Sequence, residues 1–210
     1  MKKLSKTIAS LAIATLLVAC GGAEKKAEEN TTEENSMEES VEVMDFMIDP
    51  SASNVVWAGN VLGVYTHTGS VAVSKGMLTI EGEEVKSGNF TADLTTMTPT
   101  DENYNPEEGK SKEKLVGHLS SPDFFMVDSF PTASFEVISH DVANKTITGI
   151  LTVRGQSNEE TVNDVKVDLV GKTASGKLTF NRKKYDVAFT HPAKDVVISD
   201  DVELGINLKM

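Results

Sequence analysis

Apolar and polar residues alternate with a period of two through most of the chain beyond residue 53, the pattern of β-strands that bury one face. From Asn89 to Met97, for example, Phe90, Ala92 and Leu94 fall on one side of a strand and polar residues on the other. Comparable apolar faces are formed by Val55 and Trp57, by Leu78 and Ile80, by Ala133, Phe135 and Val137, by Ile147, Gly149, Leu151 and Val153, by Val165, Val167 and Leu169, by Ala174, Gly176, Leu178 and Phe180, and by Val202, Leu204, Ile206 and Leu208. These stretches predict an all-β fold with at least seven strands.

One segment between the predicted strands has a different pattern. Pro106 to Leu119 is charged and compatible with a short helix, and Ser121-Pro122-Asp123 can begin a further turn, with serine as N-cap and proline at the first helical position. Phe124, Phe125 and Phe130 follow, and such aromatic density indicates that the segment folds onto the core. Consecutive helical residues point about 100° apart, so we expect the first two phenylalanines to diverge and at least one to plug the fold.

The order of the predicted elements constrains the sheet. No strand–helix–strand spacing recurs, so the strands should pair in an antiparallel manner. A strand with one apolar face must bury it against another sheet or inside a closed barrel, and closure also removes unpaired strand edges. The alternation alone does not distinguish a sandwich from a barrel.

Several motifs resemble those of a known family. His118-Leu-Ser-Ser-Pro-Asp-Phe-Phe125, followed by Phe130-Pro-Thr-Ala-Ser-Phe135, is similar to the signature of the YceI-like family, which comprises lipocalin-like bacterial barrels that bind polyisoprenoids and other lipids. Two later stretches agree with this resemblance, Ile147-Thr-Gly-Ile-Leu-Thr-Val-Arg-Gly155 and Gly176-Lys-Leu-Thr-Phe-Asn-Arg-Lys-Lys-Tyr185. The chain departs from the family pattern at Val116-Gly117, where the family usually has Arg-Asp, and at Asn181, where it usually has Asp.

The resemblance covers residues 46–210 and implies a closed antiparallel eight-stranded lipocalin-like β-barrel with one short helical segment at about 106–119. A barrel of eight strands is either filled by its own side chains or just wide enough for one small ligand. Small residues at inward positions would leave volume for a ligand; these are Ala92, Ala133, Gly149, Ala174 and Gly176. Alternatively, large neighbours such as Trp57 and Phe180 close the core. With the resemblance we predict an open apolar lumen.

Residues 1–19 have the pattern of a bacterial targeting segment. Three lysines precede an apolar run from Ile8 to Ala19, which is too short to cross a membrane as a stable helix. The run ends in Leu17-Val18-Ala19-Cys20, which matches a lipobox and implies cleavage before Cys20 and attachment of lipid to its sulfur. The alternative is an ordinary cleaved signal with an incidental cysteine.

Residues 20–45 have the composition of a disordered acidic tether. Beyond Cys20 they contain nine acidic residues, two lysines and no aromatic residue, so they cannot bury enough apolar surface to offset the entropy of ordering. Cys20 is the only cysteine, which excludes an internal disulfide in the domain at 46–210. This domain has a formal charge of −8, which argues against nucleic-acid partners and against electrostatic docking on anionic lipid.

The chain offers few signs of catalytic chemistry. The histidines, His67, His118, His140 and His191, lack metal-ligand spacing, and no nucleophile elbow or glycine-rich phosphate loop is present. We therefore predict a protein that is not an enzyme and needs no metal or cofactor. The alternative is an enzyme that uses His67, His118 or Asp123 on a bound lipid or ester. For His118 the sequence allows two interpretations. The side chain either caps the helix and packs against the fold, or it contacts the headgroup of a ligand.

Arg182 has two interpretations. It shares the parity of Phe180, so it can point inward at one mouth of the barrel and meet an anionic headgroup, or it can form a salt bridge with an acidic residue. We predict that the ligand-binding residues are Trp57, Tyr65, Phe90, Ala92, Leu94, Leu119, Phe124, Phe125, Phe135, Leu151, Phe180 and Arg182.

The predicted protein is a lipid-anchored, extracytoplasmic binding protein of the bacterial cell envelope. We expect Cys20 to hold it on the outer membrane, facing the periplasm or the cell surface, and the lumen to hold a polyisoprenoid, a quinone tail or another lipid. The alternative function is a filled barrel that serves as a surface interaction or structural protein.

Overall fold

The computed structural model of the protein describes residues 42–105, 107, 109–193 and 196–210. The strands in this part of the chain are β1 (Val43–Met47), β2 (Asn54–Val61), β3 (Tyr65–Glu81), β4 (Glu84–Pro99), β5 (Thr132–Asp141), β6 (Thr146–Val153), β7 (Gln156–Asp168), β8 (Thr173–Asn181) and β9 (Ile198–Lys209). The helix α1 spans Lys112–Ser120, and short 3-10 helices lie at Pro50–Ala52 (η1) and Arg182–Tyr185 (η3). The expected signal peptide at 1–19, Cys20 and the expected tether up to residue 41 lie outside the described residues.

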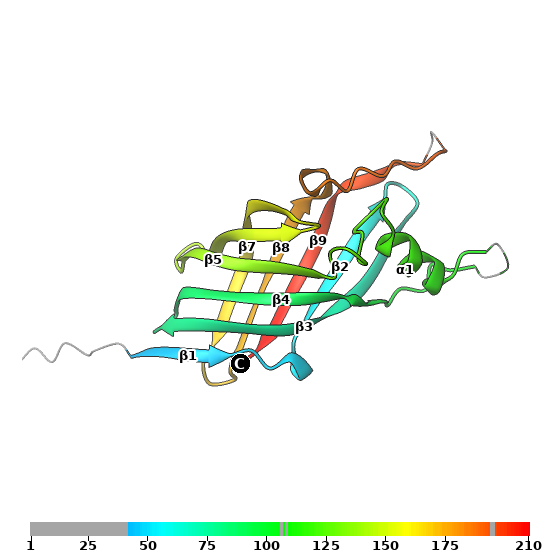
Figure 1. Ribbon diagram of the computed structural model, residues 1–210. Coiled ribbons are helices and arrows are strands. Elements are labelled where there is room, and N and C mark those ends of the chain that lie inside the picture. Colours follow the sequence, from blue (N-terminus) through cyan, green and yellow to red (C-terminus); the bar gives the residue numbers. More distant parts are fainter. Residues whose placement is uncertain (1–41, 106, 108, 194–195) are drawn as a thin grey trace, which may run out of the picture. The chain divides into compact units, whose positions relative to one another are not determined.

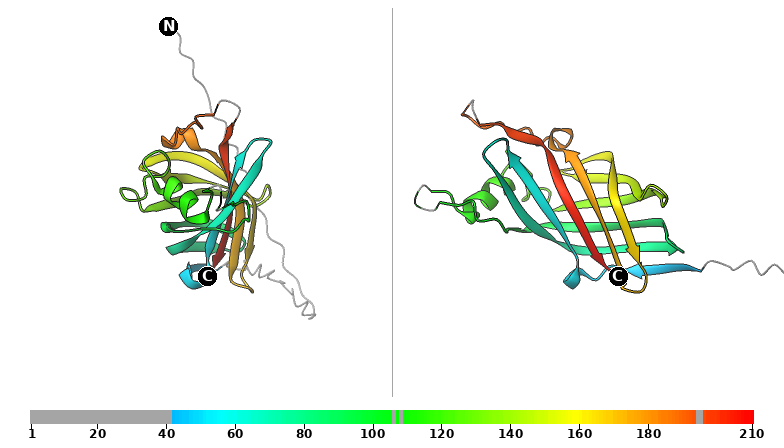
Figure 2. Two further views of the ribbon diagram at one scale, coloured as in Figure 1. Left: turned by 90° about the vertical axis from the view of Figure 1, so that its right-hand side faces the viewer. Right: turned by 180° about the vertical axis from the view of Figure 1, so that it is seen from behind.

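Eight of the nine strands in the described chain close into an antiparallel barrel. Neighbouring strands follow the order β3-β2-β9-β8-β7-β6-β5-β4, and β4 pairs back with β3 from Gly69↔Pro99 to Glu81↔Glu84. Figure 1 shows β3, β4 and β5 crossing in front of β2, β8 and β9, and the view from behind in Figure 2 shows the second set nearer the viewer. The predicted closed eight-stranded barrel is confirmed, and the sandwich is excluded.

β1 is an additional strand outside the closed ring. It pairs with the second half of β3, from Met47↔Met77 to Val43↔Glu81, while β2 pairs with the first half. β3 is 17 residues long, so one edge of it has room for both partners. The paired residues Val43 to Asp45 belong to the stretch expected as tether, so regular structure begins before residue 46.

The alternation predicted from the sequence matches the burial of the strands. In β6, every second residue from Ile147 to Val153 is buried, and β8 shows the same pattern from Ala174 to Phe180. These faces join one core that includes Phe90, whose burial with its neighbours removes apolar surface from water. Complete burial of an aliphatic or phenyl side chain stabilises the fold by about 1.5–3 kcal/mol.

The helix is shorter than the predicted segment at 106–119. It begins at Lys112, because Ser111 is its N-cap and accepts a hydrogen bond from the Lys114 N–H. Ahead of it, Asn105 and Lys110 form an isolated bridge. Ser121 is the C-cap of α1, and its N–H donates to the carbonyl of His118 at 3.1 Å. It also begins the further turn expected at this position, because its hydroxyl accepts a hydrogen bond from the Asp123 N–H at 3.3 Å.

The connection after α1 folds onto the barrel, as predicted. Its turns are held by hydrogen bonds from the Phe124 N–H to the Ser121 carbonyl and from the Phe125 N–H to the Leu119 carbonyl, each 3.0 Å long. Arg154, in the turn between β6 and β7, donates to the Phe124 carbonyl at 2.7 Å. Phe124 is buried and Phe125 half-buried, with their ring planes 55° apart. Phe124 is therefore the expected plugging residue.

No helix within the described ranges has both the length and the apolar character needed to cross a membrane.

Candidate functional site

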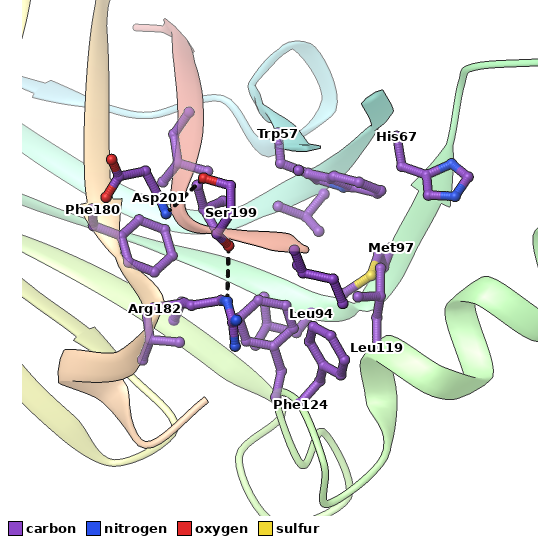
Figure 3. A pocket seen from close by; sticks show the side chains of 18 of the residues that line it. Trp57, His67, Leu94, Met97, Leu119, Phe124, Phe180, Arg182, Ser199 and Asp201 are labelled. Carbon is purple, nitrogen blue, oxygen red and sulfur yellow. Dashed lines mark hydrogen bonds between the residues drawn. The ribbon is translucent and has the colours of Figure 1, made fainter. Parts of the chain in front are cut away.

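The interior of the barrel contains a cavity of about 590 Å³. Its walls come from strands β2 to β6, β8 and β9, and from α1 and the connection that follows it. The short helix η3 and the irregular segment between η3 and β9 complete them. Figure 3 shows side chains converging on this space from several elements, including Trp57, Leu94, Leu119, Phe124 and Phe180. Most wall residues are aliphatic or aromatic, so the cavity suits an apolar ligand.

All of the residues predicted to contact a ligand lie on the wall of this one cavity. They are Trp57, Tyr65, Phe90, Ala92, Leu94, Leu119, Phe124, Phe125, Phe135, Leu151, Phe180 and Arg182. The structure thus brings together side chains that are up to 125 residues apart in the sequence. Their contact with a ligand stays a prediction.

Other wall residues were not predicted. Met97 faces the cavity although it is out of step with Phe90 and Leu94, because the register between β3 and β4 shifts beside it and the Thr96 hydroxyl donates to the Asp93 carbonyl. Phe189 and His191 belong to the irregular segment between η3 and β9. Such a segment has no period that could indicate which side chains point inward. His67 was considered only as a catalytic alternative, yet it lies on the wall.

The small inward residues do not all leave volume, which corrects one prediction. Ala92 and Ala133 line the large cavity, but a side chain at Gly149 would meet the ring of Phe135 and one at Gly176 would meet Val162. Ala174 and Gly176 instead border a second cavity of only about 40 Å³. Phe90 and Phe135, with ring centroids 5.9 Å apart, border both spaces. The barrel is therefore largely filled on one side of these rings and open on the other.

A hydrogen-bonded cluster surrounds His67 at the start of β3. The Nδ1 atom of His67 lies 3.1 Å from Oδ1 of Asp101, and the Tyr104 hydroxyl donates to Oδ2 of the same carboxylate at 2.9 Å. The N–H groups of Thr68 and Asn103 also donate to it, each at 2.9 Å. Burial would raise the pKa of Asp101, but these hydrogen bonds outweigh burial and hold the pKa at about 2.

His118 packs among aromatic rings at the end of α1. Its ring centroid lies 4.8 Å from that of Phe124 and 4.6 Å from that of Phe189, both in edge-on geometry. This supports the packing interpretation of His118, although the residue also lines the cavity. Asp123 is exposed and is not among the wall residues, so the structure does not join the three residues of the enzymatic alternative in one site.

Arg182 lines the cavity, and its guanidinium is bound by the protein itself. Nε donates to the Ser199 carbonyl at 3.0 Å, Nη1 donates to the Val187 carbonyl at 2.7 Å, and Nη2 lies 3.3 Å from Oδ1 of Asp200. Figure 3 shows the bond to Ser199. Burial lowers the pKa of Arg182, and Asp200 opposes that shift. Of the two interpretations of Arg182, the structure shows the salt bridge.

Two further observations concern polar groups. Among the described residues, Nε1 of Trp57 is the one buried side-chain nitrogen or oxygen that lacks a hydrogen-bond partner. The same part of the chain holds no group of three or more His, Cys, Asp or Glu residues arranged to bind a metal ion.

Comparison with known proteins identifies relatives. In Staphylococcus aureus (strain bovine RF122 / ET3-1), the UPF0312 protein SAB2563 is 35% identical over 97 residues, or 41% of this chain and 55% of that protein. UPF0312 protein SAUSA300_2620 of S. aureus (strain USA300) is 32% identical over 102 residues, covering 43% of this chain and 58% of that protein. The match thus spans little more than half the length of these relatives.

Solved structures share the fold. BcnA of Burkholderia cenocepacia superposes with a TM-score of 0.60 at 19% identity, over 77% of this chain and 98% of BcnA. A domain of Saccharophagus degradans described as polyisoprenoid binding gives a TM-score of 0.50 at 12% identity, over 80% of this chain and 97% of that domain. The model of the YceI-like domain matches residues 46–210, the whole of the closed barrel. The chain therefore belongs to the YceI-like family.

Proposed function

We propose that this protein is a lipid-anchored, extracytoplasmic binding protein whose barrel holds one apolar chain, of the polyisoprenoid or quinone-tail class. The observation that carries the proposal is the apolar cavity of about 590 Å³ inside the closed barrel. Its volume lies within the range of about 300–1,000 Å³ that is typical of small-molecule sites. Most of the wall residues are apolar and lie on β-strands, which suits an apolar chain better than a compact polar molecule.

The driving force for binding is the removal of apolar surface from water. Transfer of the ligand tail into this cavity stabilises the complex by about 25 cal/mol for each Å² buried, offset by the ordering of a flexible chain. The wall residues are positioned before the ligand arrives, because the strands that carry them are fixed by the closed ladder. A preformed wall lowers the ordering cost on the protein side.

Two comparisons support the choice of ligand class. The chain belongs to the YceI-like family, and the domain from Saccharophagus degradans that shares its fold is described as polyisoprenoid binding. At 12% identity the second comparison supports only the architecture, so the ligand class rests on the cavity together with the family.

The cavity also bears on the alternatives. A completely filled barrel would not contain this volume, so a purely structural role has less support. An enzyme that used Asp123 would need this side chain in the cavity, whereas it is exposed outside the wall. Binding without covalent chemistry requires only the packing and shape that the wall provides.

Anchoring is the second part of the proposal. The sequence Leu17-Val18-Ala19-Cys20 after a short apolar run supports cleavage before Cys20 and its lipidation. A lipidated Cys20 would attach the acidic tether and the barrel to the outer membrane, facing the periplasm or the cell surface. A barrel held near a membrane has a ready supply of apolar chains.

The test of ligand binding is mass spectrometry of organic extracts from the purified native protein, released from the membrane in mild detergent. We expect an isoprenoid lipid in about equimolar amount, together with saturable rebinding of the same lipid after its removal. A matched control is the variant Ala92→Arg, which places an unpaired charge on the cavity wall and should lose the lipid. Extracts without lipid, combined with no saturable rebinding of isoprenoid chains, would refute the proposal.

A further inference from the structure

His67 lies where the cavity wall becomes polar. It is the third residue of β3 and pairs with Gly59 of β2, and its side chain lines the cavity while keeping 17% of its surface exposed. Figure 3 shows His67 at the edge of the cavity, on the same side as Trp57 and Met97. A ligand whose tail fills the apolar part would bring its polar end to such a position.

The protein fixes which nitrogen of His67 faces a partner. Asp101 accepts hydrogen bonds from two backbone N–H groups and from Tyr104, and its pKa of about 2 means that the carboxylate is ionised at neutral pH. An ionised carboxylate only accepts hydrogen bonds, so the Nδ1 atom of His67 must carry the proton that joins the two residues. The lone pair of a neutral ring is then on Nε2.

The ring of His67 is also held in orientation. Tyr104 stacks on it, with ring centroids 5.3 Å apart and planes 21° apart, and Tyr65 approaches edge-on at 4.8 Å. Because Tyr104 is itself bonded to Asp101, the ring has one side fixed by a hydrogen bond and one face fixed by stacking. Such positioning leaves little rotational freedom to lose when a ligand binds.

Nε2 of His67 is available for a ligand. Over the described ranges it forms no hydrogen bond, and it is not among the buried atoms that lack a partner, so it is an accessible atom of a side chain that lines the cavity. Of the wall cations, Arg182 pairs with Asp200, and Lys110 also has an interaction partner. Asp201 adds a negative charge to the wall, and the domain as a whole has a formal charge of −8. These charges disfavour a phosphate and favour an uncharged polar end.

We infer that Nε2 of His67 accepts a hydrogen bond from a hydroxyl group at the polar end of the bound chain, so that the cavity selects apolar chains ending in an alcohol or phenol. This inference rests on the proposed function, because it concerns the polar end of the same ligand. Asp101 and Tyr104 act as positioning residues, since they orient the imidazole without touching the hydroxyl.

The test compares two ligands with the same isoprenoid tail, an alcohol and its methyl ether. The wild-type protein should bind the alcohol about three- to ten-fold more tightly than the ether, the value of one hydrogen bond. His67→Phe keeps a ring of similar shape but no acceptor, so it should bind both ligands with the affinity that the wild type has for the ether. His140→Asn is the matched control, because His140 lies outside the cavity and accepts from the Val85 N–H; it should leave the alcohol-to-ether ratio unchanged.

Nitrogen-15 spectra of the His67 ring provide a measurement that needs no variant. Addition of the alcohol should shift the Nε2 resonance, and addition of the ether should not. Equal wild-type affinities for the two ligands, or an unchanged ratio in His67→Phe, would overturn the inference while leaving the proposed function in place. Binding of neither ligand would refute both. A phosphate-ended chain that binds more tightly than the alcohol and loses this advantage in His67→Phe would show that the residue recognises an anion instead.

Discussion

Arg182 and Asp200 form an ion pair of 3.3 Å in which the guanidinium side chain is only 4% exposed while the carboxylate side chain is 40% exposed. The buried partner therefore depends on the protein for its hydrogen bonds, and it finds them in the carbonyls of Ser199 and Val187 as well as in Asp200. Through these bonds Arg182 connects η3, the irregular segment after it and the start of β9 at one side of the cavity mouth.

The first prediction concerns this connection. Arg182→Met keeps an unbranched apolar stem but removes every donor, and each carbonyl left without a partner costs about 1–3 kcal/mol. We expect a clear loss in the free energy of unfolding, measured by urea denaturation. Asp200→Asn, which removes only the half-exposed partner, should cost less. Equal stability of Arg182→Met and wild type would show that water replaces the guanidinium without penalty.

The second prediction concerns acid. The pKa of Asp101 is about 2 in the folded protein and 3.8 ordinarily, so the ionised carboxylate stabilises the fold above pH 4. This stabilisation, about 2 kcal/mol, is lost as the pH falls from about 4 to about 2, because protonation then costs the folded state its hydrogen bonds.

The measurement for Asp101 is the unfolding free energy between about pH 6 and pH 2, for wild type and for Asp101→Asn. The variant should be less stable at pH 6, and the difference between the two proteins should shrink as the pH falls. Other carboxylates titrate in both proteins and cancel in this comparison. A difference that stays constant down to pH 2 would contradict the shift.

The third prediction concerns the connection between α1 and β5. Phe124 is buried and contacts the rings of His118 and Phe189, so Phe124→Ala should cost about 3–5 kcal/mol. For a domain of this size the melting temperature should fall by about 6–20 °C. Phe125→Ala should cost less, since Phe125 is half-buried beside the cavity. Unchanged melting temperatures for both variants would mean that the connection is a surface loop.

The strands were predictable because each has one buried face and therefore a period of two. Ile147 to Val153 is an example in which every residue takes the expected side. The short strand β1 was not expected, because Val43 to Met47 follows an acidic stretch and its pairing depends on the unusual length of β3. The alternation alone did not indicate that the sheet closes into a barrel. That prediction came only from the resemblance to the family.

The cavity was predictable in its residues but not in its extent. The parity of Phe90 and Ala92 indicates that they point inward, but it does not reveal how far a neighbouring ring reaches. Gly149 leaves no space, since the ring of Phe135 covers it, whereas Ala92 borders the open part. The link between His67 and Asp101 joins residues 34 positions apart through side-chain geometry, and no local pattern encodes it.

The fourth prediction concerns the anchor. Multiple acyl chains on Cys20 would contribute about 0.8 kcal/mol for each buried methylene, which makes membrane attachment stable. Cys20→Ser should leave the barrel folded, as judged by its circular dichroism and melting temperature, and should move the protein from the membrane fraction to the aqueous one. If the variant sediments with membranes as fully as wild type, lipidation of Cys20 does not hold the protein there.

The fifth prediction separates the open side of the barrel from the filled side. Ala92 borders the large cavity, so Ala92→Leu should be nearly neutral for stability, because the new side chain enters space that is otherwise available to the ligand. Ala174 borders the cavity of only about 40 Å³, so Ala174→Leu should overpack the core and cost about 1–3 kcal/mol. The two substitutions add the same atoms at inward positions of the same barrel, which makes each the control for the other.

The two variants should rank in the opposite order when their effect on ligand affinity is measured instead of their effect on stability. Ala92→Leu should weaken the affinity for a long isoprenoid chain more than for a short one, because the long chain needs the volume that leucine now occupies. Ala174→Leu should leave the ratio of the two affinities unchanged, since it lies beyond the rings of Phe90 and Phe135. The measurements are melting temperatures without ligand and affinities for the two chain lengths. A destabilised Ala92→Leu with unchanged affinity for both chains would place the ligand outside the barrel.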